Sequence, residues 1–430
     1  MIDTRPTTLE GWLNYLEKLH PKTIDMGLER VRRVRDSLRL TVDFPVITVA
    51  GTNGKGSVCA MLESIFSQAS YNTGCYTSPH LLRYNERIRV NQHEISDEIL
   101  CDVFAEIESA RESVDTTLTY FEFGTLAAML IFVRARVDVA ILEVGLGGRL
   151  DAVNVFDTDC AILTSIDLDH MDYLGSTREA IGQEKIGIFR ENKPAICAEP
   201  DIPRLLYEKM RSASARLYCI NDAFGYMADN QQWRYRGISG HHYNLPLPAL
   251  KGDFQLQNAS AVLAALEILE ETLPVPVNAI RRGLVETILA GRFQMISARP
   301  TIILDVAHNP AAARKLSINL KALPTKGYTY AVAGMLKDKD MTGTLRVLKN
   351  NIDRWLIGGL NVARGASENE IRQALEEAGV EQKNILCSFP DINSAYVYAR
   401  EHVNDDDRIC VFGSFHTVSL VMKGIDGLNS

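Results

Sequence analysis

Three short segments carry side chains that could hold a phosphate group or a metal ion, and two of these segments are rich in glycine. The first is Gly51-Thr-Asn-Gly-Lys-Gly-Ser57, which follows the apolar run Val46–Ala50 and precedes a helix-like stretch. A glycine-rich turn between strand and helix points backbone N–H groups at one spot, and the helix N-terminus adds positive potential. Lys55 could supply charge to phosphate oxygens, and Ser57 could supply a hydroxyl to Mg²⁺. A valine at the first glycine position and an extra glycine after the lysine depart from the usual phosphate-loop spacing, so a plain strand–helix turn is the alternative.

The other two segments follow apolar runs that read as neighbouring strands. Glu143 lies at the end of the run Val139–Val144, where a carboxylate could reach the Mg²⁺ of a nucleotide. His170 follows the run Cys160–Ile166 and a short acidic stretch. In an open α/β sheet, sites form outside the carboxyl ends of the strands, so these side chains would meet at one edge. The alternatives are a solvent-exposed glutamate and a structural histidine.

The elements that must position these residues alternate along most of the chain. The apolar runs are β-branched and apolar on both faces, which is typical of buried parallel strands. Helical periodicity marks Asp97–Glu112, Thr125–Arg134, Thr177–Phe189 and Gln257–Glu271. The segment Tyr218–Leu250, rich in Trp, Tyr, His, Asn and Gly, predicts short antiparallel strands attached to the main sheet. Repeated strand–helix units predict an α/β fold with right-handed crossovers.

The length of 430 residues exceeds what a single hydrophobic core usually serves, so we expect two domains. A second alternating series begins near Thr301 and is long enough for a sheet of roughly five or six strands. Its expected strands are Thr301–Val306, Tyr328–Ala333, Trp355–Ile357, Asn384–Cys387 and Arg408–Phe412. We place the boundary near Ala290–Pro300, which gives domains of residues 1–295 and 296–430.

The composition excludes several classes of protein. Hydrophobic residues make up 46% and charged residues 23%, an ordinary globular balance. The net charge of −8 argues against nucleic acid or an anionic membrane as a general partner. No apolar run approaches the ~20 residues that cross a bilayer, and the first residues lack an apolar signal core. Eight cysteines without Cys-x-x-Cys spacing predict reduced thiols in a cytoplasmic protein.

Across essentially its whole length, the chain resembles the folylpolyglutamate synthases, especially the bifunctional dihydrofolate synthase/folylpolyglutamate synthases, which are relatives of the Mur ligases. In the first half, the motifs that carry the resemblance are Lys22-Thr-Ile-Asp-Met-Gly-Leu-Glu-Arg30, Gly51-Thr-Asn-Gly-Lys-Gly-Ser57, Thr77-Ser-Pro-His80, Phe121-Glu-Phe-Gly124, Glu143-Val-Gly-Leu-Gly-Gly-Arg-Leu-Asp-Ala152, Asp169-His170 and Glu184-Lys185. In the second half they are Gly291-Arg-Phe293, Asp305-Val-Ala-His-Asn-Pro310 and Gly413-Ser-Phe-His416. The resemblance implies a phosphate-loop-containing, Mur-ligase-like N-terminal domain with a mainly parallel sheet and a small antiparallel β subdomain. It also implies a Rossmann-like α/β C-terminal ligase domain.

The activity that the resemblance implies is ATP-dependent addition of L-glutamate to 7,8-dihydropteroate and to reduced folates. An acceptor carboxylate would attack the γ-phosphate of ATP, and the amine of glutamate would then displace phosphate from the acyl phosphate. Two Mg²⁺ ions are expected, with K⁺ as a further cation and a carbamylated Lys185 as an anionic metal ligand. A monomer in which the nucleotide is clamped between the two domains is expected.

The site residues carried over from the resemblance fall into four groups. ATP contacts are expected from Gly54, Lys55, Gly56, Ser57, Asn258, Arg292 and Asp305, and metal ligands from Ser57, Ser78, Glu143, His170 and Lys185. Pterin or folate contacts are expected from Asp25, Met26, Gly27, Phe121, Glu122, Phe123, Gly124, Leu150, Asp151 and Ala152. The catalytic residues would be Lys55, Lys185, His170, His308 and His416, and the glutamate side would hold His308, Ser414 and His416. On their own, Phe121 and Phe123 could be core residues, Asn258 a helix cap and Lys185 a surface lysine.

Four other functions compete with this one. A Mur-type peptidoglycan ligase shares the ATP chemistry, but a phosphate loop at residue 51 leaves little room for a preceding UDP-sugar domain. A monofunctional folylpolyglutamate synthase would only extend folates, whereas the Lys22–Arg30 segment looks like the bifunctional type. A switch GTPase needs an Asn-Lys-x-Asp motif, and Asn192-Lys193-Pro194-Ala195 lacks the Asp. Retention of Lys55, Glu143 and His170 argues against a non-catalytic nucleotide-binding scaffold.

Overall fold

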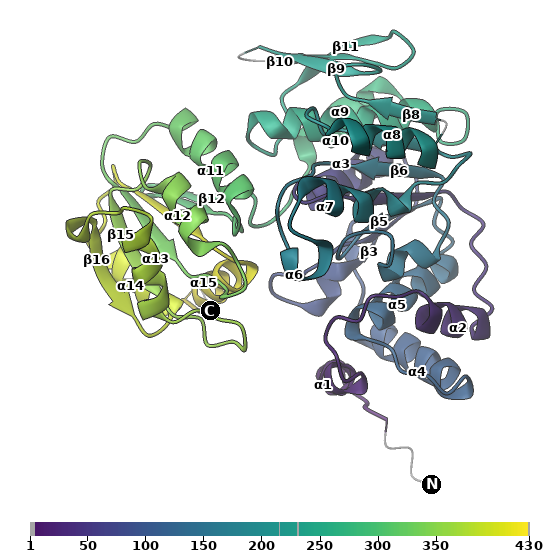
Figure 1. Cartoon of the computed structure of the whole chain (residues 1–430), viewed down its shortest axis with the longest axis horizontal. Helices are drawn as coiled ribbons and strands as arrows, with labels where there is room; N and C mark the ends of the chain where they lie inside the picture. The colour runs from purple at the N-terminus through teal and green to yellow at the C-terminus, as the bar shows by residue number, and fades with distance from the viewer. Residues whose placement is uncertain (1–4, 215, 230–231, 429–430) are drawn as a thin grey trace. The chain divides into compact units, whose positions relative to one another are not determined.

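The computed structural model describes residues 5–214, 216–229 and 232–428. The chain forms two compact units, and each contains its own sheet (Figure 1). The first unit comprises Met1–Ala249 and Gln255–Thr287, and the second comprises Leu250–Phe254 and Ile288–Ser430. The α/β class expected from the sequence is confirmed for both units.

An eight-stranded sheet forms the centre of the first unit, in the order β4-β3-β2-β5-β1-β6-β7-β8. Its strands are β1 (Val46–Ala50), β2 (Thr73–Tyr76), β3 (Ile88–Val90), β4 (His93–Glu94), β5 (Val139–Glu143), β6 (Cys160–Leu163), β7 (Pro194–Cys197) and β8 (Arg216–Cys219). All neighbours from β2 to β8 pair in parallel, whereas β3 and β4 form an antiparallel edge. The central strands β1, β5 and β6 are buried along their whole length, which explains their unbroken apolar sequences.

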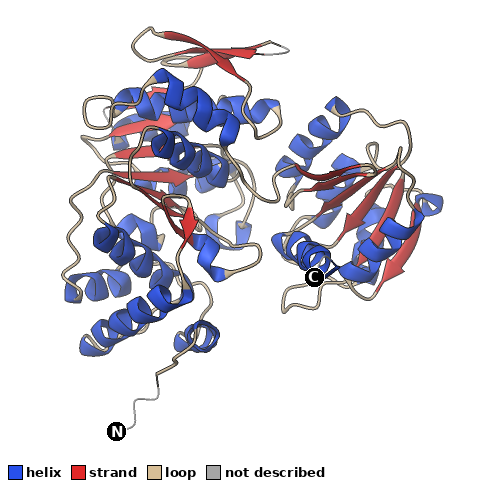
Figure 2. Cartoon of the chain, turned by 180° about the vertical axis from the view of Figure 1, so that it is seen from behind, coloured by secondary structure: helices blue, strands red, loops and turns tan. Residues whose placement is uncertain are grey.

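Helices flank this sheet on both sides (Figure 2). They are α1 (Leu9–Leu19), α2 (Glu29–Ser37), α3 (Lys55–Gln68), α4 (Asp97–Ser113), α5 (Tyr120–Ala135), α6 (Met171–Leu174), α7 (Arg178–Lys185), α8 (Arg204–Ala213), α9 (Asp253–Ile268) and α10 (Val277–Glu286). Short 3₁₀ helices occur at η1 (Tyr84–Arg87), η2 (Ala152–Val155) and η3 (Ile186–Ile188). None of the helices in the described part of the chain is long and apolar enough to cross a bilayer.

Several element boundaries differ from the expectation. Helix α5 begins at Tyr120 rather than near Thr125, because Thr119 and Glu122 form a capping box at its N-terminus. Helix α9 begins at Asp253 rather than Gln257. The stretch expected to be one helix up to Phe189 is divided into α7 and η3.

The small antiparallel sheet that was expected in the first unit is present, with strands β9 (Gly225–Ala228), β10 (Gln232–Arg236) and β11 (His242–Pro246). Trp233 and Tyr235 of β10 are buried and alternate with exposed polar side chains. This period of two is typical of a sheet with one covered face. Tyr218 was expected in this region but belongs to β8, which pairs in parallel with β7 at the edge of the main sheet.

The second unit is built on a six-stranded sheet in the order β12-β13-β17-β14-β15-β16. Its strands are β12 (Gln294–Ala298), β13 (Thr301–Leu304), β14 (Thr329–Ala333), β15 (Arg354–Gly358), β16 (Ile385–Phe389) and β17 (Arg408–Phe412). The other helical elements of this unit are α11 (Pro310–Ala322), α12 (Met341–Leu348), α13 (Glu368–Glu377), η4 (Gln382–Asn384), α14 (Ile392–His402) and α15 (Phe415–Leu428). Only β12 pairs antiparallel, and it was not foreseen from the sequence.

Candidate active site

The glycine-rich turn after β1 fits tightly against two neighbouring elements. Gly51 (φ +151°) and Gly54 (φ +96°) have backbone conformations that favour glycine. A Cβ atom at Gly51 would lie 1.9 Å from Thr164 Oγ1, and one at Gly54 would lie 2.7 Å from Asn258 Oδ1. Both glycines are therefore required by close approach as well as by conformation.

The turn is held to the segment that follows β6. The Thr52 amide donates to the Ser165 carbonyl at 2.8 Å, and the Asn53 amide donates to Ser165 Oγ at 3.0 Å. Thr164 Oγ1 donates to the Asn53 carbonyl at 2.8 Å. These bonds explain why β6 ends at Leu163 rather than Ile166. Lys55 opens helix α3, and its Nζ donates to the Gly51 carbonyl at 3.0 Å.

Ser57 lies in the first turn of α3 and is buried, with 2% of its surface exposed. Gln255 Nε2 donates to Ser57 Oγ at 3.2 Å, and Asn258 Nδ2 donates to Gln255 Oε1 at 2.9 Å. Asn258 therefore lies within α9 beside the turn and does not cap the helix. Gln255 was not predicted as a site residue, because the helix was expected to begin only at Gln257.

Glu143 ends β5, which pairs with β1 on one side and β2 on the other. Its carboxylate is buried, which excludes the solvent-exposed alternative. The amide of Ser78, two residues beyond the end of β2, donates to Glu143 Oε2 at 3.1 Å. The parallel strands thus bring Glu143 and the glycine-rich turn to one edge of the sheet, as the strand pattern predicted, and Ser78, which the resemblance implied, lies at the same edge.

Lys185 is buried at the end of α7, so the surface-lysine alternative is wrong. Burial and, to a smaller extent, the charge of Lys55 lower the pKa of Lys185 to about 7, against the opposing charges of Asp169 and Asp151. A lysine in this state carries a substantial fraction of neutral, nucleophilic amine near neutral pH. His170 precedes α6 in a left-handed conformation (φ +50°), with its Nε2 3.9 Å from Asp169 Oδ1.

Within the described residues, no group of three or more His, Cys, Asp and Glu side chains is arranged to hold a metal ion. A divalent cation at this sheet edge would therefore need other oxygen donors besides Glu143. The buried Ser57 hydroxyl and the phosphate oxygens of a nucleotide are donors of the type that Mg²⁺ prefers.

The three segments expected on the pterin side lie next to one another. The Gly27 amide donates to the Leu150 carbonyl at 3.3 Å. A Cβ atom at Gly147 would lie 3.6 Å from Met26 Cε, and one at Gly145 would lie 2.7 Å from Phe121 Cζ. Ala152 is buried in η2, the 3₁₀ helix that follows Leu150.

Carboxylates hold these segments in place. Arg30 donates to Asp25 Oδ2 at 2.7 Å and to Glu122 Oε1 at 3.1 Å, and Glu122 also completes the capping box of α5. Asp151 accepts hydrogen bonds from the amides of Leu146 and Val153 at 2.8 and 3.1 Å. Burial raises the pKa of Asp151 to about 7.

Two further features on the pterin side complete the comparison with the sequence. Phe123 is fully buried among core residues, which agrees with the alternative that at least one of the two phenylalanines is a core residue. Phe121 is only partly buried. Gly124 lies in α5, where a Cβ atom would meet Tyr84 Oη at 2.6 Å. Arg30 was missed by the sequence reasoning, although it ends the quoted Lys22–Arg30 motif.

In the second unit, the expected nucleotide residues Asp305 and Arg292 lie at one edge of the sheet, because Asp305 follows β13 and Arg292 precedes β12, which pairs antiparallel with β13. Asp305 follows β13, is partly buried, and accepts from the amides of Phe293 and Ala307 at 2.9 and 2.8 Å. Burial raises the pKa of Asp305, and the nearby Arg292 opposes this shift. The Arg292 guanidinium lies over the Phe415 ring at 4.9 Å.

The expected glutamate-side residues lie at the same edge. His308 Nδ1 donates to the Val306 carbonyl at 2.8 Å, so this ring nitrogen carries a hydrogen. The buried Ser414 Oγ accepts from the Thr417 amide at 2.9 Å, within the first turn of α15. Partial desolvation, and then the charge of Arg364, lowers the pKa of His416, which remains exposed. His416 is therefore largely neutral at pH 7 and can accept a proton.

Family comparison identifies both units. Residues 49–266 match the Mur ligase middle domain, and residues 291–415 match the Mur ligase glutamate ligase domain. The dihydrofolate synthase/folylpolyglutamate synthase of Escherichia coli is 47% identical over 423 residues, covering 98% of this chain and 96% of the relative.

Solved structures show the same similarity. E. coli FolC in complex with DHPP and ADP superposes with a TM-score of 0.91 at 46% identity, covering 99% of each chain. A bifunctional folylpolyglutamate synthase/dihydrofolate synthase with Mn, AMPPNP and L-glutamate bound superposes with a TM-score of 0.89 at 42% identity, covering 99% of this chain and 100% of that chain.

Proposed function

Since the chain belongs to the Mur ligase family and, within it, to the dihydrofolate synthase/folylpolyglutamate synthases, we propose that it is an ATP-dependent glutamate ligase. It joins L-glutamate to 7,8-dihydropteroate, which forms dihydrofolate, and to reduced folates, which forms folylpolyglutamates. The relatives that match over nearly the whole chain carry both names and have been solved with ADP, DHPP and L-glutamate. This makes a Mur-type peptidoglycan ligase, a switch GTPase and a non-catalytic scaffold less suitable descriptions.

One observation in the structure carries this proposal. The glycine-rich turn, Ser78 and Glu143 come from the ends of three adjacent parallel strands, and Ser78 contacts Glu143 directly. The backbone amides at the start of α3 and the ammonium of Lys55 provide positive potential for the phosphates of ATP. Gly54, Gly56 and Asn258 complete the nucleotide side of the first unit. Arg292 and Asp305 are the nucleotide contacts that we propose for the second unit.

The donor set at this edge fits Mg²⁺. Ser57, Ser78 and Glu143 would hold one ion together with phosphate oxygens, and His170 and Lys185 would hold the second, with Lys185 as a carbamate. A relative has been solved with Mn and AMPPNP bound, which supports a divalent cation beside the nucleotide. When bound, the ions screen the negative charge of the phosphates during transfer.

The reaction joins two anionic substrates and therefore depends on charge stabilisation and positioning. Lys55 stabilises the γ-phosphate as the acceptor carboxylate attacks it, and ADP leaves. The α-amine of L-glutamate then attacks the acyl carbon, and inorganic phosphate leaves. We propose that the proton released by this amine is accepted near His308 and His416, and that Ser414 lies near the incoming glutamate.

The segments around Met26, Phe121 and Leu150 bind the pterin ring in this proposal. The loop around Gly27 contacts the Leu150 carbonyl, and Arg30 ties the same loop to α5, so the three segments form one framework. This framework includes the Lys22–Arg30 motif and favours a bifunctional enzyme over one that only extends folates. We further propose a monomer in a reducing cytoplasm, with which the eight free cysteines agree.

The deciding experiment supplies ATP, Mg²⁺ and radiolabelled L-glutamate with dihydropteroate or tetrahydrofolate in separate reactions. Labelled dihydrofolate and labelled folate diglutamate are the expected products. Absence of product with both acceptors would contradict the ligase function. Product with tetrahydrofolate alone would contradict only the bifunctional part.

A further inference from the structure

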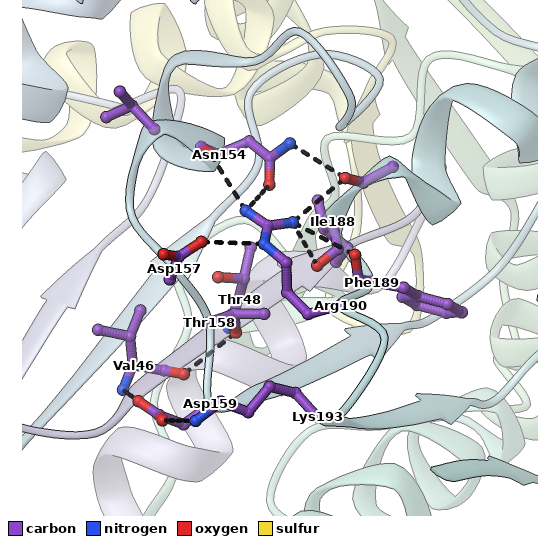
Figure 3. Close-up of polar contacts among 12 residues, drawn as sticks. Val46, Thr48, Asn154, Asp157, Thr158, Asp159, Ile188, Phe189, Arg190 and Lys193 are labelled. Carbon is purple, nitrogen blue, oxygen red and sulfur yellow. Dashed lines mark hydrogen bonds and ion pairs between the residues drawn. The ribbon is translucent and has the colours of Figure 1, made fainter. Parts of the chain in front are cut away.

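A network of polar contacts surrounds Asn154 and Arg190 (Figure 3), which lie close in the sequence to the pterin-side loop and to Lys185. Asn154 lies in η2, and Arg190 follows η3. We propose that Asn154 and Arg190 form a clasp that positions Lys185 relative to loop 147–152. This inference rests on the ligase function proposed above, in which Lys185 serves the second metal ion and the loop serves the pterin.

The two backbone segments that the clasp joins are in direct contact. The Arg149 amide donates to the Glu184 carbonyl at 2.8 Å. A Cβ atom at Gly148 would lie 2.9 Å from the Lys185 carbonyl oxygen, and one at Gly187 would lie 2.5 Å from Arg149 Cα. Because the backbones approach this closely, a displacement of either segment moves the other.

Asn154 bridges both segments with one side chain. Its Nδ2 donates to the Arg149 carbonyl at 3.0 Å and to the Gly187 carbonyl at 3.0 Å. Its Oδ1 accepts from Arg190 Nη2 at 3.0 Å. An aspartate at this position would keep the size and the bond to Arg190 but would lose both donors.

Arg190 fixes the other end of the clasp. Its Nη1 donates to the carbonyls of Gly187, Ile188 and Phe189 at 3.4, 3.2 and 3.3 Å, where η3 ends. Its Nε donates to the exposed Asp157 carboxylate at 3.0 Å. A planar guanidinium can satisfy these directions together, whereas a lysine ammonium on a shorter reach cannot.

The chain between the two clasp residues is anchored to β1, the strand that delivers the phosphate loop. Thr158 Oγ1 donates to the Val46 carbonyl at 3.1 Å, and Asp159 Oδ2 accepts from the Val46 amide at 2.9 Å (Figure 3). Lys193 pairs with Asp159 at 2.8 Å. The clasp therefore fixes the positions of loop 147–152 and Lys185 relative to β1 and the phosphate loop that follows it. Asn154 and Arg190 are positioning residues and touch no reacting atom.

The test compares clasp variants with variants of neighbouring contacts. Asn154→Asp removes the two donors, Arg190→Met removes the guanidinium, and Arg190→Lys is the conservative variant. Asp157→Asn and Lys193→Gln are matched controls. Asp157→Asn removes a charge beside Arg190 but keeps a side-chain oxygen that can accept from its Nε, and Lys193→Gln removes the ion pair with Asp159 and touches neither clasp residue. Steady-state kinetics vary dihydropteroate, L-glutamate and Mg²⁺ separately. Binding of Mn²⁺ to the complex with a non-hydrolysable ATP analogue is measured by electron paramagnetic resonance.

For Asn154→Asp and Arg190→Met we expect kcat to fall and Mn²⁺ affinity to weaken, each by about 10- to 100-fold. The Mg²⁺ concentration at half-maximal rate and the KM for dihydropteroate should rise, while the KM for L-glutamate stays unchanged. Arg190→Lys should lie between these variants and the wild type, and both controls should match the wild type.

Two results would overturn the clasp. One is unchanged Mn²⁺ affinity and unchanged KM for dihydropteroate in both strong variants. The other is a fall in kcat alone with every binding constant preserved, which is the behaviour of a reduced folded fraction. If the wild type binds Mn²⁺ and the clasp variants bind it weakly, but no variant or wild type ligates glutamate, the clasp stands and the proposed function fails.

Discussion

At the scale of single residues, Lys55 has the most direct chemical role. It is a lysine on the phosphate loop, and its ammonium lies 3.0 Å from the Gly51 carbonyl of the same turn. We expect Lys55→Ala to reduce kcat by more than about 10²-fold, because it removes a charge that stabilises the transferring phosphoryl group. Initial-rate measurements of ADP release check this, with Lys193→Ala as a surface-lysine control. Near-normal turnover in Lys55→Ala would refute the assignment of the site.

Site residues were easier to predict from the sequence when their contact partners are close along the chain than when these partners are distant. Gly54, Lys55 and Ser57 share one local motif, so their strand–turn–helix context could be read directly. Gln255 reaches Ser57 from 198 positions away, and Arg30 reaches Glu122 from 92 positions away. Such contacts exist only after the chain has folded, and a single sequence carries no signal for their pairing.

At the scale of elements, α5 shows how packing can reverse an intrinsic preference. Replacing a glycine within a helix by alanine usually stabilises the helix by about 1 kcal/mol. At Gly124 the new Cβ atom would lie 2.6 Å from Tyr84 Oη, and this hydroxyl is buried without a hydrogen-bond partner among the described residues. We therefore expect Gly124→Ala to lower the free energy of unfolding by about 1–3 kcal/mol.

The double variant Gly124→Ala/Tyr84→Phe isolates this contact. Tyr84→Phe removes the nearer of the two hydroxyl oxygens that the Cβ would meet, while Tyr76 Oη stays at 3.0 Å, so part of the lost stability should return. Tyr84→Phe alone should change stability little, since within the described part of the chain its hydroxyl makes no hydrogen bond that would be lost. Urea unfolding followed by circular dichroism measures all three variants. A stabilised Gly124→Ala would contradict the packing around α5.

Element type was more predictable than element boundaries. The strands β1 and β17 match the expected Val46–Ala50 and Arg408–Phe412, because continuous apolar runs between turns mark buried strands. The start of α5 was missed, although Thr119 and Glu122 carry a capping-box signature. The edge strand β12 was missed because it has no buried apolar run. Its apolar residues Met295 and Ile296 are exposed and stand between the polar residues Gln294 and Ser297.

At the scale of the whole molecule, the protein and its substrates carry net charge of the same sign. The chain carries a formal charge of −8, yet ATP, folates and glutamate are all anions. Attraction must therefore arise locally, from Lys55, Arg292, the helix N-terminus at the phosphate loop and the proposed Mg²⁺ ions. Length and strand pattern predicted two α/β units, but they could not predict that Leu250–Phe254 groups with the second unit. That grouping depends on contacts such as the one between Asn319 Nδ2 and the Lys251 carbonyl at 3.3 Å.

The central claim is that the molecule activates an acceptor carboxylate by phosphorylation before glutamate attacks. Dihydropteroate labelled with ¹⁸O in its carboxylate tests this directly in a reaction with ATP, Mg²⁺ and L-glutamate. Attack of a labelled oxygen on the γ-phosphate, followed by displacement at the acyl carbon, transfers one ¹⁸O to inorganic phosphate for each dihydrofolate formed. We predict mass-spectrometric detection of singly labelled phosphate in a one-to-one ratio with product. Dihydrofolate formed together with unlabelled phosphate would contradict the account.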